Sequence, residues 1–127
     1  MILLLDTHIF LWYITDDPSL PDDHRTAIRD PNNEVFLSTA SVWEAVIKYA
    51  LGKLPLPEPP HLYMPRQRAR HRLASLPIEE DVFPHLASLP PLHRDPFDRL
   101  LIAQALRYDL TLCTVDAVVR AYPVKVL

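Results

Sequence analysis

Four acidic residues stand at positions from which a fold could bring them together: Asp6, Glu44, Asp98 and Asp116. Two of them directly follow short apolar runs, and the other two fall near the start of apolar segments with helical spacing. Carboxylates held close together would repel one another and raise each other's pKa values, so such a cluster needs cations nearby. Oxygen ligands favour Mg²⁺ or Mn²⁺, and no Cys/His spacing in the chain suggests a zinc site.

Each acid also has a local structural explanation. Asp6 can cap a helix that follows it, and Asp98 in a first helical turn is favoured by the helix dipole. Ser41-x-x-Glu44 matches a capping box, in which the glutamate turns back to the serine amide, and locally this is the preferred interpretation. The neighbours of Glu44 are apolar, however, and a charge held among them would need a cation.

Short apolar strands alternate with helical segments along the chain, and this pattern indicates a parallel sheet covered on both faces. Strands are predicted at 2–5, 35–37, 110–115 and 124–127, with another short strand at 73–77. Helices are predicted at 9–13, 21–30, 42–49, 79–87 and 96–106, and in an Arg-rich segment that Pro65 opens. Ligand sites in such folds gather beyond the carboxyl ends of the strands, where Asp6 and Asp116 would meet. Helices that open on that edge would present Glu44 and Asp98.

Proline and glycine mark the ends of several elements. Asp95 precedes Pro96, so its carboxylate is expected to cap the helix that starts there. Gly52 is the only glycine and is expected to terminate the helix at 42–49, whereas Pro84 should delay or kink the helix at 79–87. The proline-rich stretch 55–60 is expected to be an extended connector. One glycine against fourteen prolines excludes a Gly-rich phosphate-binding loop.

Composition sets the class of protein. With 127 residues, of which 49% are hydrophobic, the chain is expected to form one domain with a real core. The single cysteine, Cys113, has apolar neighbours and is expected to be a buried thiol. The apolar run at 1–5 is too short for a signal peptide or a membrane span, so we expect a cytoplasmic protein.

The formal net charge of −3 argues against a protein that simply coats nucleic acid. Four arginines nevertheless cluster within seven positions: Arg66, Arg68, Arg70 and Arg72. A solvated helix face, a phosphate contact and an acidic protein partner all explain this cluster. The sequence leaves these three interpretations open.

Four segments in a fixed order resemble PIN-domain proteins of the VapC-like toxin class, over nearly the whole chain. They are Leu-Leu-Asp6-Thr-His-Ile-Phe-Leu-Trp, Ser-Thr-Ala-Ser-Val-Trp-Glu44, Asp95-Pro-Phe-Asp98-Arg-Leu-Leu-Ile-Ala-Gln-Ala and Thr114-Val-Asp116. The resemblance implies a single PIN domain over residues 1–127. It also implies a three-layer α/β/α sandwich around a mainly parallel sheet of four to five strands.

The same resemblance implies the roles of individual residues. The four acidic site positions of the family correspond to Asp6, Glu44, Asp98 and Asp116. Asp95 matches the capping residue beside them, and Thr114 matches the small hydroxyl residue that helps to hold the site. His8 and Arg99 also recur in the motif, and packing or support of the site is expected for both.

The implied activity is that of a metal-dependent endoribonuclease acting on single-stranded or looped RNA with Mg²⁺ or Mn²⁺. Asp6, Asp98 and Asp116 are the expected principal ligands, and Glu44 is expected to bind through water or to orient the attacking water. A carboxylate-held metal can activate water for in-line attack on a phosphodiester, so the product should carry a 5′-phosphate. The resemblance further implies a homodimer and a cognate antitoxin, as in type II toxin–antitoxin pairs.

Two other hypotheses compete with this one. A haloacid-dehalogenase-like phosphatase needs a second aspartate two positions after the first, where this chain has His8. A non-catalytic PIN-like binding module, which would keep the acids for folding or partner recognition, is the stronger rival. Metal binding and metal-dependent cleavage would distinguish it from a nuclease.

Overall fold

A parallel sheet lies at the centre of the computed structural model, which describes residues 1–127. Its strands, in the spatial order β3-β2-β1-β4, are β1 (Ile2–Leu5), β2 (Glu34–Ser38), β3 (Ala74–Leu76) and β4 (Thr111–Cys113). Each neighbouring pair runs parallel. β1 pairs on both sides, and its leucines are fully buried because helices cover both faces of a parallel sheet.

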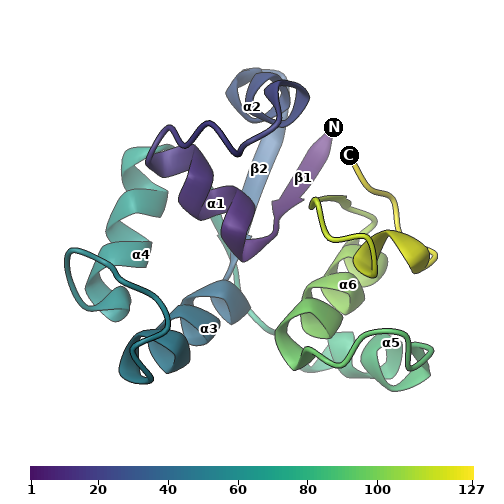
Figure 1. Cartoon of the computed structure of the whole chain (residues 1–127). Helices are drawn as coiled ribbons and strands as arrows, with labels where there is room; N and C mark the ends of the chain where they lie inside the picture. Colours follow the sequence, from purple (N-terminus) through teal and green to yellow (C-terminus); the bar gives the residue numbers. More distant parts are fainter.

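Six helices form the outer layers, and they pack on both sides of the sheet (Figure 1). They are α1 (Thr7–Ile14), α2 (Asp22–Arg29), α3 (Thr39–Ala50), α4 (Pro60–Arg70), α5 (Phe83–Ser88) and α6 (Pro96–Tyr108). Short 3₁₀ turns, η1 (Glu80–Val82) and η2 (Val119–Ala121), precede α5 and follow β4. This arrangement confirms the predicted three-layer α/β/α fold.

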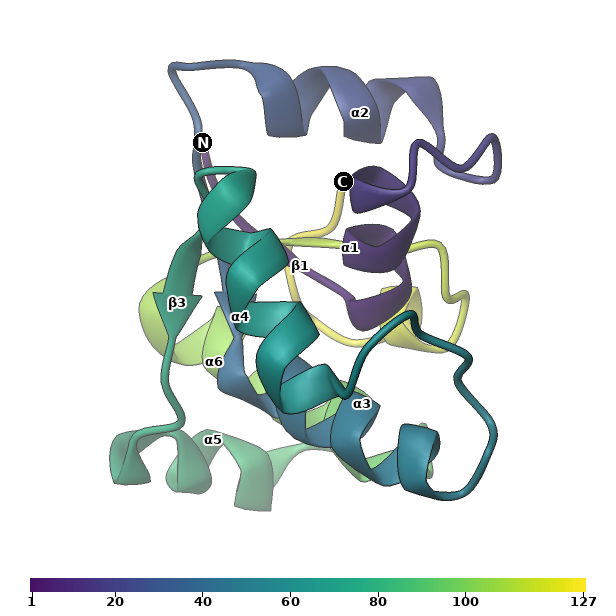
Figure 2. The same ribbon diagram turned by 90° about the vertical axis from the view of Figure 1, so that its left-hand side faces the viewer.

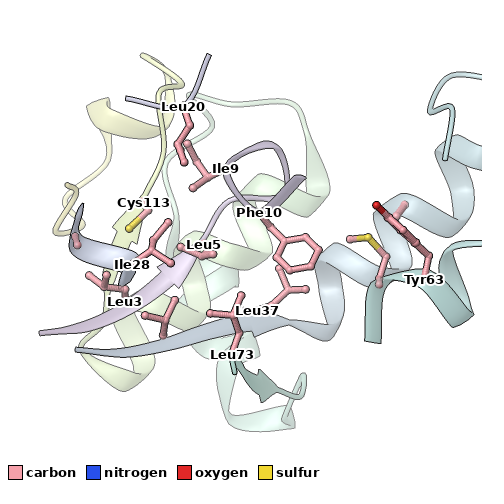
Figure 3. Packing of buried hydrophobic residues seen from close by; sticks show 14 residues of the cluster. Leu3, Leu5, Ile9, Phe10, Leu20, Ile28, Leu37, Tyr63, Leu73 and Cys113 are labelled. Carbon is pink, nitrogen blue, oxygen red and sulfur yellow. The ribbon is translucent and has the colours of Figure 1, made fainter. Parts of the chain in front are cut away.

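The two faces of the sheet carry separate hydrophobic cores, as the period of two along a strand requires. Leu3 and Leu5 of β1 point into a core shared with Phe10 of α1 (Figure 3). Leu4 points the other way, into a core with Leu101 of α6. β1 is therefore the strand around which both layers pack, and Figure 2 shows it leading into α1.

Several predicted details are confirmed. Asp95 caps α6, and Gly52 follows α3 with a φ of +70°, the left-handed conformation that glycine adopts most readily. The segment around Pro84 is split into η1 and α5, with the proline in the first turn of α5. Cys113 is fully buried. No helix has both the length and the apolar character needed to cross a membrane.

Two predicted elements differ. α4 begins at Pro60 rather than Pro65, because Pro60 itself occupies the first helical turn and Pro65 lies inside the helix. The predicted last strand at 124–127 is reduced to one bridge, between Leu112 and Val126. β4 spans only three residues, which leaves little ladder for a further strand to extend.

Candidate active site

A cavity of about 360 Å³ lies at the carboxyl edge of the sheet. It brings together all four predicted site acids and the capping residue Asp95, which come from four separate stretches of the chain. The lining residues are Asp6, His8, Trp12, Glu44, Lys48, His93, Asp95, Asp98, Val115 and Asp116. A larger cavity of about 620 Å³ lies at the amino ends of β2 and β3, but it contains none of these acids and is not the candidate site.

Asp6 lies where β1 ends and α1 begins. Its backbone occupies the N-cap position, but its side chain makes no capping bond. Instead Oδ2 accepts a hydrogen bond of 2.8 Å from the hydroxyl of Thr114, while the Asp6 amide donates to the carbonyl of Cys113 over 3.0 Å. Burial raises the pKa of Asp6, and the Thr114 hydroxyl partly opposes that shift. The Asp6 carboxylate therefore faces the cavity, held from the neighbouring strand.

Glu44 does not form the predicted capping box. α3 begins at Thr39, and Ser38 caps it by accepting from the amide of Ala40 over 3.0 Å. Glu44 consequently lies in the second turn, where its Oε1 accepts from the Thr7 hydroxyl over 2.7 Å. Its Oε2 forms an ion pair with Lys48, one turn further along the helix. The capping-box interpretation was wrong, and the expectation that this buried charge has a cation partner is confirmed.

Asp98 is presented by the first turn of α6. Asp95 caps this helix, its Oδ1 accepting from the amides of Phe97 over 2.8 Å and Asp98 over 3.3 Å. The Asp98 carboxylate is thus free of the cap and reaches the cavity. Burial, together with the negative charges of Asp6, Asp95 and Glu44, raises the pKa of Asp98 to about 7.

His93 bridges two of the acids. Its Nε2 lies 3.0 Å from Oδ2 of Asp98 and 3.1 Å from Oδ2 of Asp116, and its Nδ1 accepts a hydrogen bond from the amide of Asp95 over 3.1 Å. An imidazole nitrogen that accepts carries no proton, so the proton of the neutral ring is on Nε2. His93 therefore donates toward the carboxylates.

Asp116 follows β4 and is fixed by its own turn. Its Oδ1 accepts from the amides of Val118 over 2.8 Å and Val119 over 3.2 Å. Burial raises the pKa of Asp116, but the hydrogen bonds from His93 and these two amides outweigh burial, and the pKa is lowered overall. The pKa of Asp116 is therefore lowered and that of Asp98 is raised, although the same imidazole contacts both carboxylates.

Comparison with models of protein families shows which family the chain belongs to. A model described as "PIN domain" matches residues 3–125. The chain belongs to the PIN domain family. The resemblance drawn from the four sequence segments is thereby confirmed.

One relative of this PIN domain is a VapC protein. Ribonuclease VapC16 of Mycobacterium tuberculosis is 40% identical over 58 residues, which is 46% of this chain and 41% of that protein. The chain therefore aligns with less than half the length of this relative. The VapC-like character predicted from the motifs agrees with this match.

Solved structures share the fold. The VapBC2 structure from Rickettsia felis, bound to a DNA fragment from their promoter, matches with a TM-score of 0.76 at 19% identity, covering 100% of this chain and 98% of that one. VapBC-1 from nontypeable Haemophilus influenzae gives 0.66 at 18% identity, covering 100% and 97%. FitAcB from Neisseria gonorrhoeae gives 0.64 at 21% identity, covering 98% and 96%. At these identities the likeness shows the fold alone.

The donor groups of this PIN domain fit a divalent cation. His93, Asp98 and Asp116 place one potential ligand atom each within 4.8 Å of one another. In the arrangement seen here the two carboxylates are the available donors, because Nε2 of His93 carries a proton. Asp98, whose pKa is raised partly by neighbouring negative charges, is the group whose ionised form a cation would stabilise most. Carboxylate oxygens predominate around the cavity, as hard cations require.

The loop that carries His93 is anchored through one tyrosine hydroxyl, that of the residue directly after η2. Tyr122 Oη accepts from the His93 amide over 2.8 Å and donates to the carbonyl of Pro90 over 2.8 Å. Arg99 also donates to Tyr122 Oη and to the Pro90 carbonyl, over 3.1 and 3.0 Å. Arg99 thus supports the site from outside, as the sequence predicted, while His8 lines the cavity itself.

Sequence reasoning assigned no role to two residues of the site, His93 and Lys48. The spacing of Lys48 four residues after Glu44 is a local signal for an ion pair, and His93 opens the segment that contains Asp95 and Asp98. The arginine cluster lies elsewhere: no member lines this cavity, and Arg66 pairs with Glu58 at 2.8 Å on the exposed surface of α4. Arg72 lines the larger cavity.

Proposed function

We propose that this PIN domain is a metal-dependent endoribonuclease and the toxin of a type II toxin–antitoxin pair. The observation that carries the proposal is the convergence of Asp6, Glu44, Asp98 and Asp116 on one cavity in a chain of this family. The name of its relative, Ribonuclease VapC16, supports an activity on RNA. Asp6, Asp98 and Asp116 are the proposed principal ligands of Mg²⁺ or Mn²⁺.

A bound divalent ion would lower the pKa of a water molecule and stabilise negative charge on the phosphodiester oxygens. The chain's part is to hold the carboxylates in place. The Thr114 hydroxyl fixes Asp6, the amides after Asp116 fix that side chain, and the start of α6 aims Asp98 at the cavity. These supports leave carboxylate oxygens directed at a common space.

Glu44 has a different environment, since both of its oxygens already accept from the protein. We propose that it orients the attacking water or contacts the ion through water, rather than acting as a principal ligand. Attack by water leaves the 2′-hydroxyl unused. The products should therefore carry a 5′-phosphate and a 3′-hydroxyl.

We further propose a cognate antitoxin and a homodimer. The solved structures named VapBC2 and VapBC-1 share the fold, and the resemblance to VapC-like proteins implies both kinds of partner. Trp43 and Leu51 of the α3 region expose 52% and 62% of their surface, which a protein contact would cover. The family likeness, rather than this exposure, carries the proposal.

The non-catalytic binding module stays the second candidate because of one observation. Each of the four acids accepts a hydrogen bond or ion pair from within the protein, as acids kept for folding would do. Under this alternative the protein would bind RNA or a partner without cleaving it. Metal-dependent cleavage separates the two.

The test uses a mixed pool of structured RNAs with purified protein in Mg²⁺, in Mn²⁺ and in chelator. Asp98→Asn keeps the shape of the side chain and removes its charge. Asp109→Asn is the matched control, because Asp109 is exposed, lies outside the cavity and has a positive φ that asparagine tolerates. We expect metal-dependent products with 5′-phosphates from the wild type and from the control, and none from Asp98→Asn.

Cleavage that survives both chelator and Asp98→Asn would refute the proposed mechanism. A folded wild type that binds Mn²⁺ in calorimetry but cleaves none of the pool would favour the binding module. Loss of Mn²⁺ binding in Asp98→Asn, with binding retained in Asp109→Asn, would assign the metal site to the cavity independently of cleavage.

A further inference from the structure

The acidic cavity contains one permanently charged cation. Among its ten lining residues Lys48 is the only lysine, and there is no arginine. Its side chain is one-third exposed, on the third turn of α3, and it lines the cavity. A polyanion such as RNA would meet negative charge at every other ionised side chain there.

Glu44 fixes this ammonium. The glutamate is 3% exposed and its second oxygen is bound by the hydroxyl of Thr7, so the carboxylate has little freedom to turn. Lys48 lies one turn away in the favourable order, glutamate before lysine at i and i+4. The ion pair therefore holds the ammonium in one place instead of leaving a flexible surface lysine.

Lys48 still has donors to offer. An ammonium group carries three N–H donors, and its contact with Glu44 is the only hydrogen bond that the Lys48 side chain makes. Burial lowers the pKa of Lys48, but Glu44, with smaller contributions from Asp95 and Asp98, outweighs burial and raises it. The group is thus charged at neutral pH and has donors left for an anion.

We propose that Lys48 is a substrate-binding residue that donates to a phosphate oxygen of the RNA strand entering the cavity, and that Glu44 is its positioning residue. This inference rests on the proposed action on RNA and adds to it the group that admits a phosphodiester into an acidic cavity. A lysine ammonium binds phosphate as a compact point charge. No pairing elsewhere in the chain competes for it.

The test measures RNA binding separately from cleavage. All proteins carry Asp98→Asn, and each binds a fluorescent single-stranded RNA of mixed sequence in Mg²⁺ at several salt concentrations. Each phosphate contact on a single strand contributes about 0.7 to the slope of log affinity against log salt. We expect Lys48→Met to lower that slope by about 0.7 and to weaken binding roughly tenfold at the lowest salt.

Three further variants make the comparison specific. Lys53→Met removes the same charge from an exposed lysine outside the cavity and should leave the slope unchanged. Lys48→Arg keeps the charge and should keep most of the slope. Glu44→Gln with Lys48→Met removes both members of the ion pair, so it leaves no unpaired buried carboxylate and guards against misfolding. Because Glu44 positions Lys48, the double variant should lose less slope relative to Glu44→Gln alone than Lys48→Met loses relative to its parent. An equal loss would overturn the positioning role of Glu44.

The outcomes separate this inference from the proposed function. An equal slope for Lys48→Met and its parent, with RNA bound by both, overturns the role of Lys48 whatever the wild type cleaves. A reduced slope supports that role even if the wild type shows no metal-dependent cleavage, in which case only the nuclease proposal fails. Absence of RNA binding by the parent, in Mg²⁺ and in chelator, overturns the role of Lys48, and the cleavage test on the wild type then decides the nuclease proposal separately.

Discussion

Asp98 is expected to lower the stability of the protein in chelator at neutral pH. Its pKa is raised from 3.8 to about 7 in the folded state, first by burial and then by the charges of Asp6, Asp95 and Glu44. At pH values between 3.8 and about 7, the carboxyl group of Asp98 holds a proton in the folded protein that it has released in the unfolded chain. The contribution of Asp98 to the free energy of unfolding therefore falls as pH rises through this range and levels off above pH 7.

The size of the effect follows from the shift. The interval from 3.8 to about 7, at 1.36 kcal/mol per pKa unit, sets an upper bound of about 4 kcal/mol. The Asp98 side chain keeps 13% exposure, and its acidic neighbours titrate with it, so we expect about 2 kcal/mol. Asp98→Asn removes this penalty. The variant should match the wild type near pH 4 and exceed its stability by about 2 kcal/mol above pH 7.

Urea unfolding in chelator, repeated from pH 4 to pH 8, measures this difference. Subtracting the variant from the wild type removes the contributions of groups that titrate alike in both proteins, and Asp109→Asn supplies a control that should show no such trend. A stability difference that is the same at every pH would refute the electrostatic reasoning. Adding Mn²⁺ above pH 7 should then stabilise the wild type more than Asp98→Asn, because ligand binding to the folded state alone raises its stability.

Three further substitutions test the supports of the site and the core. Thr114→Val removes the hydroxyl that donates to Asp6, and we expect it to lower the free energy of unfolding in urea by about 1–2 kcal/mol. Its Mn²⁺ affinity in calorimetry should be roughly tenfold weaker, and an unchanged affinity would contradict the support role of Thr114. Tyr122→Phe should speed amide hydrogen exchange at His93 while leaving the core amides protected, and equal protection at His93 would show that the loop is held by other contacts. Leu101→Ala, in the core on the α6 side, should cost about 2–5 kcal/mol in urea unfolding, and a loss below about 1 kcal/mol would mean that this core is poorly packed.

The elements around the site could be predicted because their local signals agree with their tertiary role. β1 is a continuous apolar run that is buried on both faces, and α6 has a cap, a proline in its first turn and a long apolar sequence. Both lead directly to a site acid, Asp6 and Asp98. The convergence of the acids on one edge of the sheet then follows from the parallel pairing of β1 and β4.

The capping box at Ser41 shows where local reasoning stops. Ser38 and Ser41 are both competent caps, and the chain takes the earlier one because β2 ends at Ser38 and the helix follows without a loop. Glu44 is then displaced from the first turn into the interior. Its hydrogen-bond partner Thr7 is 37 residues away, a distance over which periodicity and capping patterns carry no information.

His93 was missed for the same reason. Its bond to Asp116 joins residues 23 apart, and the loop that presents it is shaped by the Tyr122 hydroxyl from beyond β4. A histidine near acids in a sequence has many structural uses, whereas a single Nε2 within 3.1 Å of two carboxylates has few. Only the folded arrangement distinguishes these cases.

The hydrogen bonds around the acids explain how one edge of a small sheet holds so much negative charge. Asp6 has Thr114, Glu44 has Thr7 and Lys48, and Asp116 has two backbone amides besides His93, so these three are stabilised largely from within. The Asp98 carboxylate has only the contact with His93, and its raised pKa shows that its ionised form is stabilised less than theirs. A divalent cation held by these acids would therefore stabilise the ionised form of Asp98 more than that of the other three. Metal affinity and stability at neutral pH should thus be coupled through the Asp98 carboxylate. A substitution that stabilises ionised Asp98 in the metal-free protein should lower the affinity for the metal by a corresponding amount.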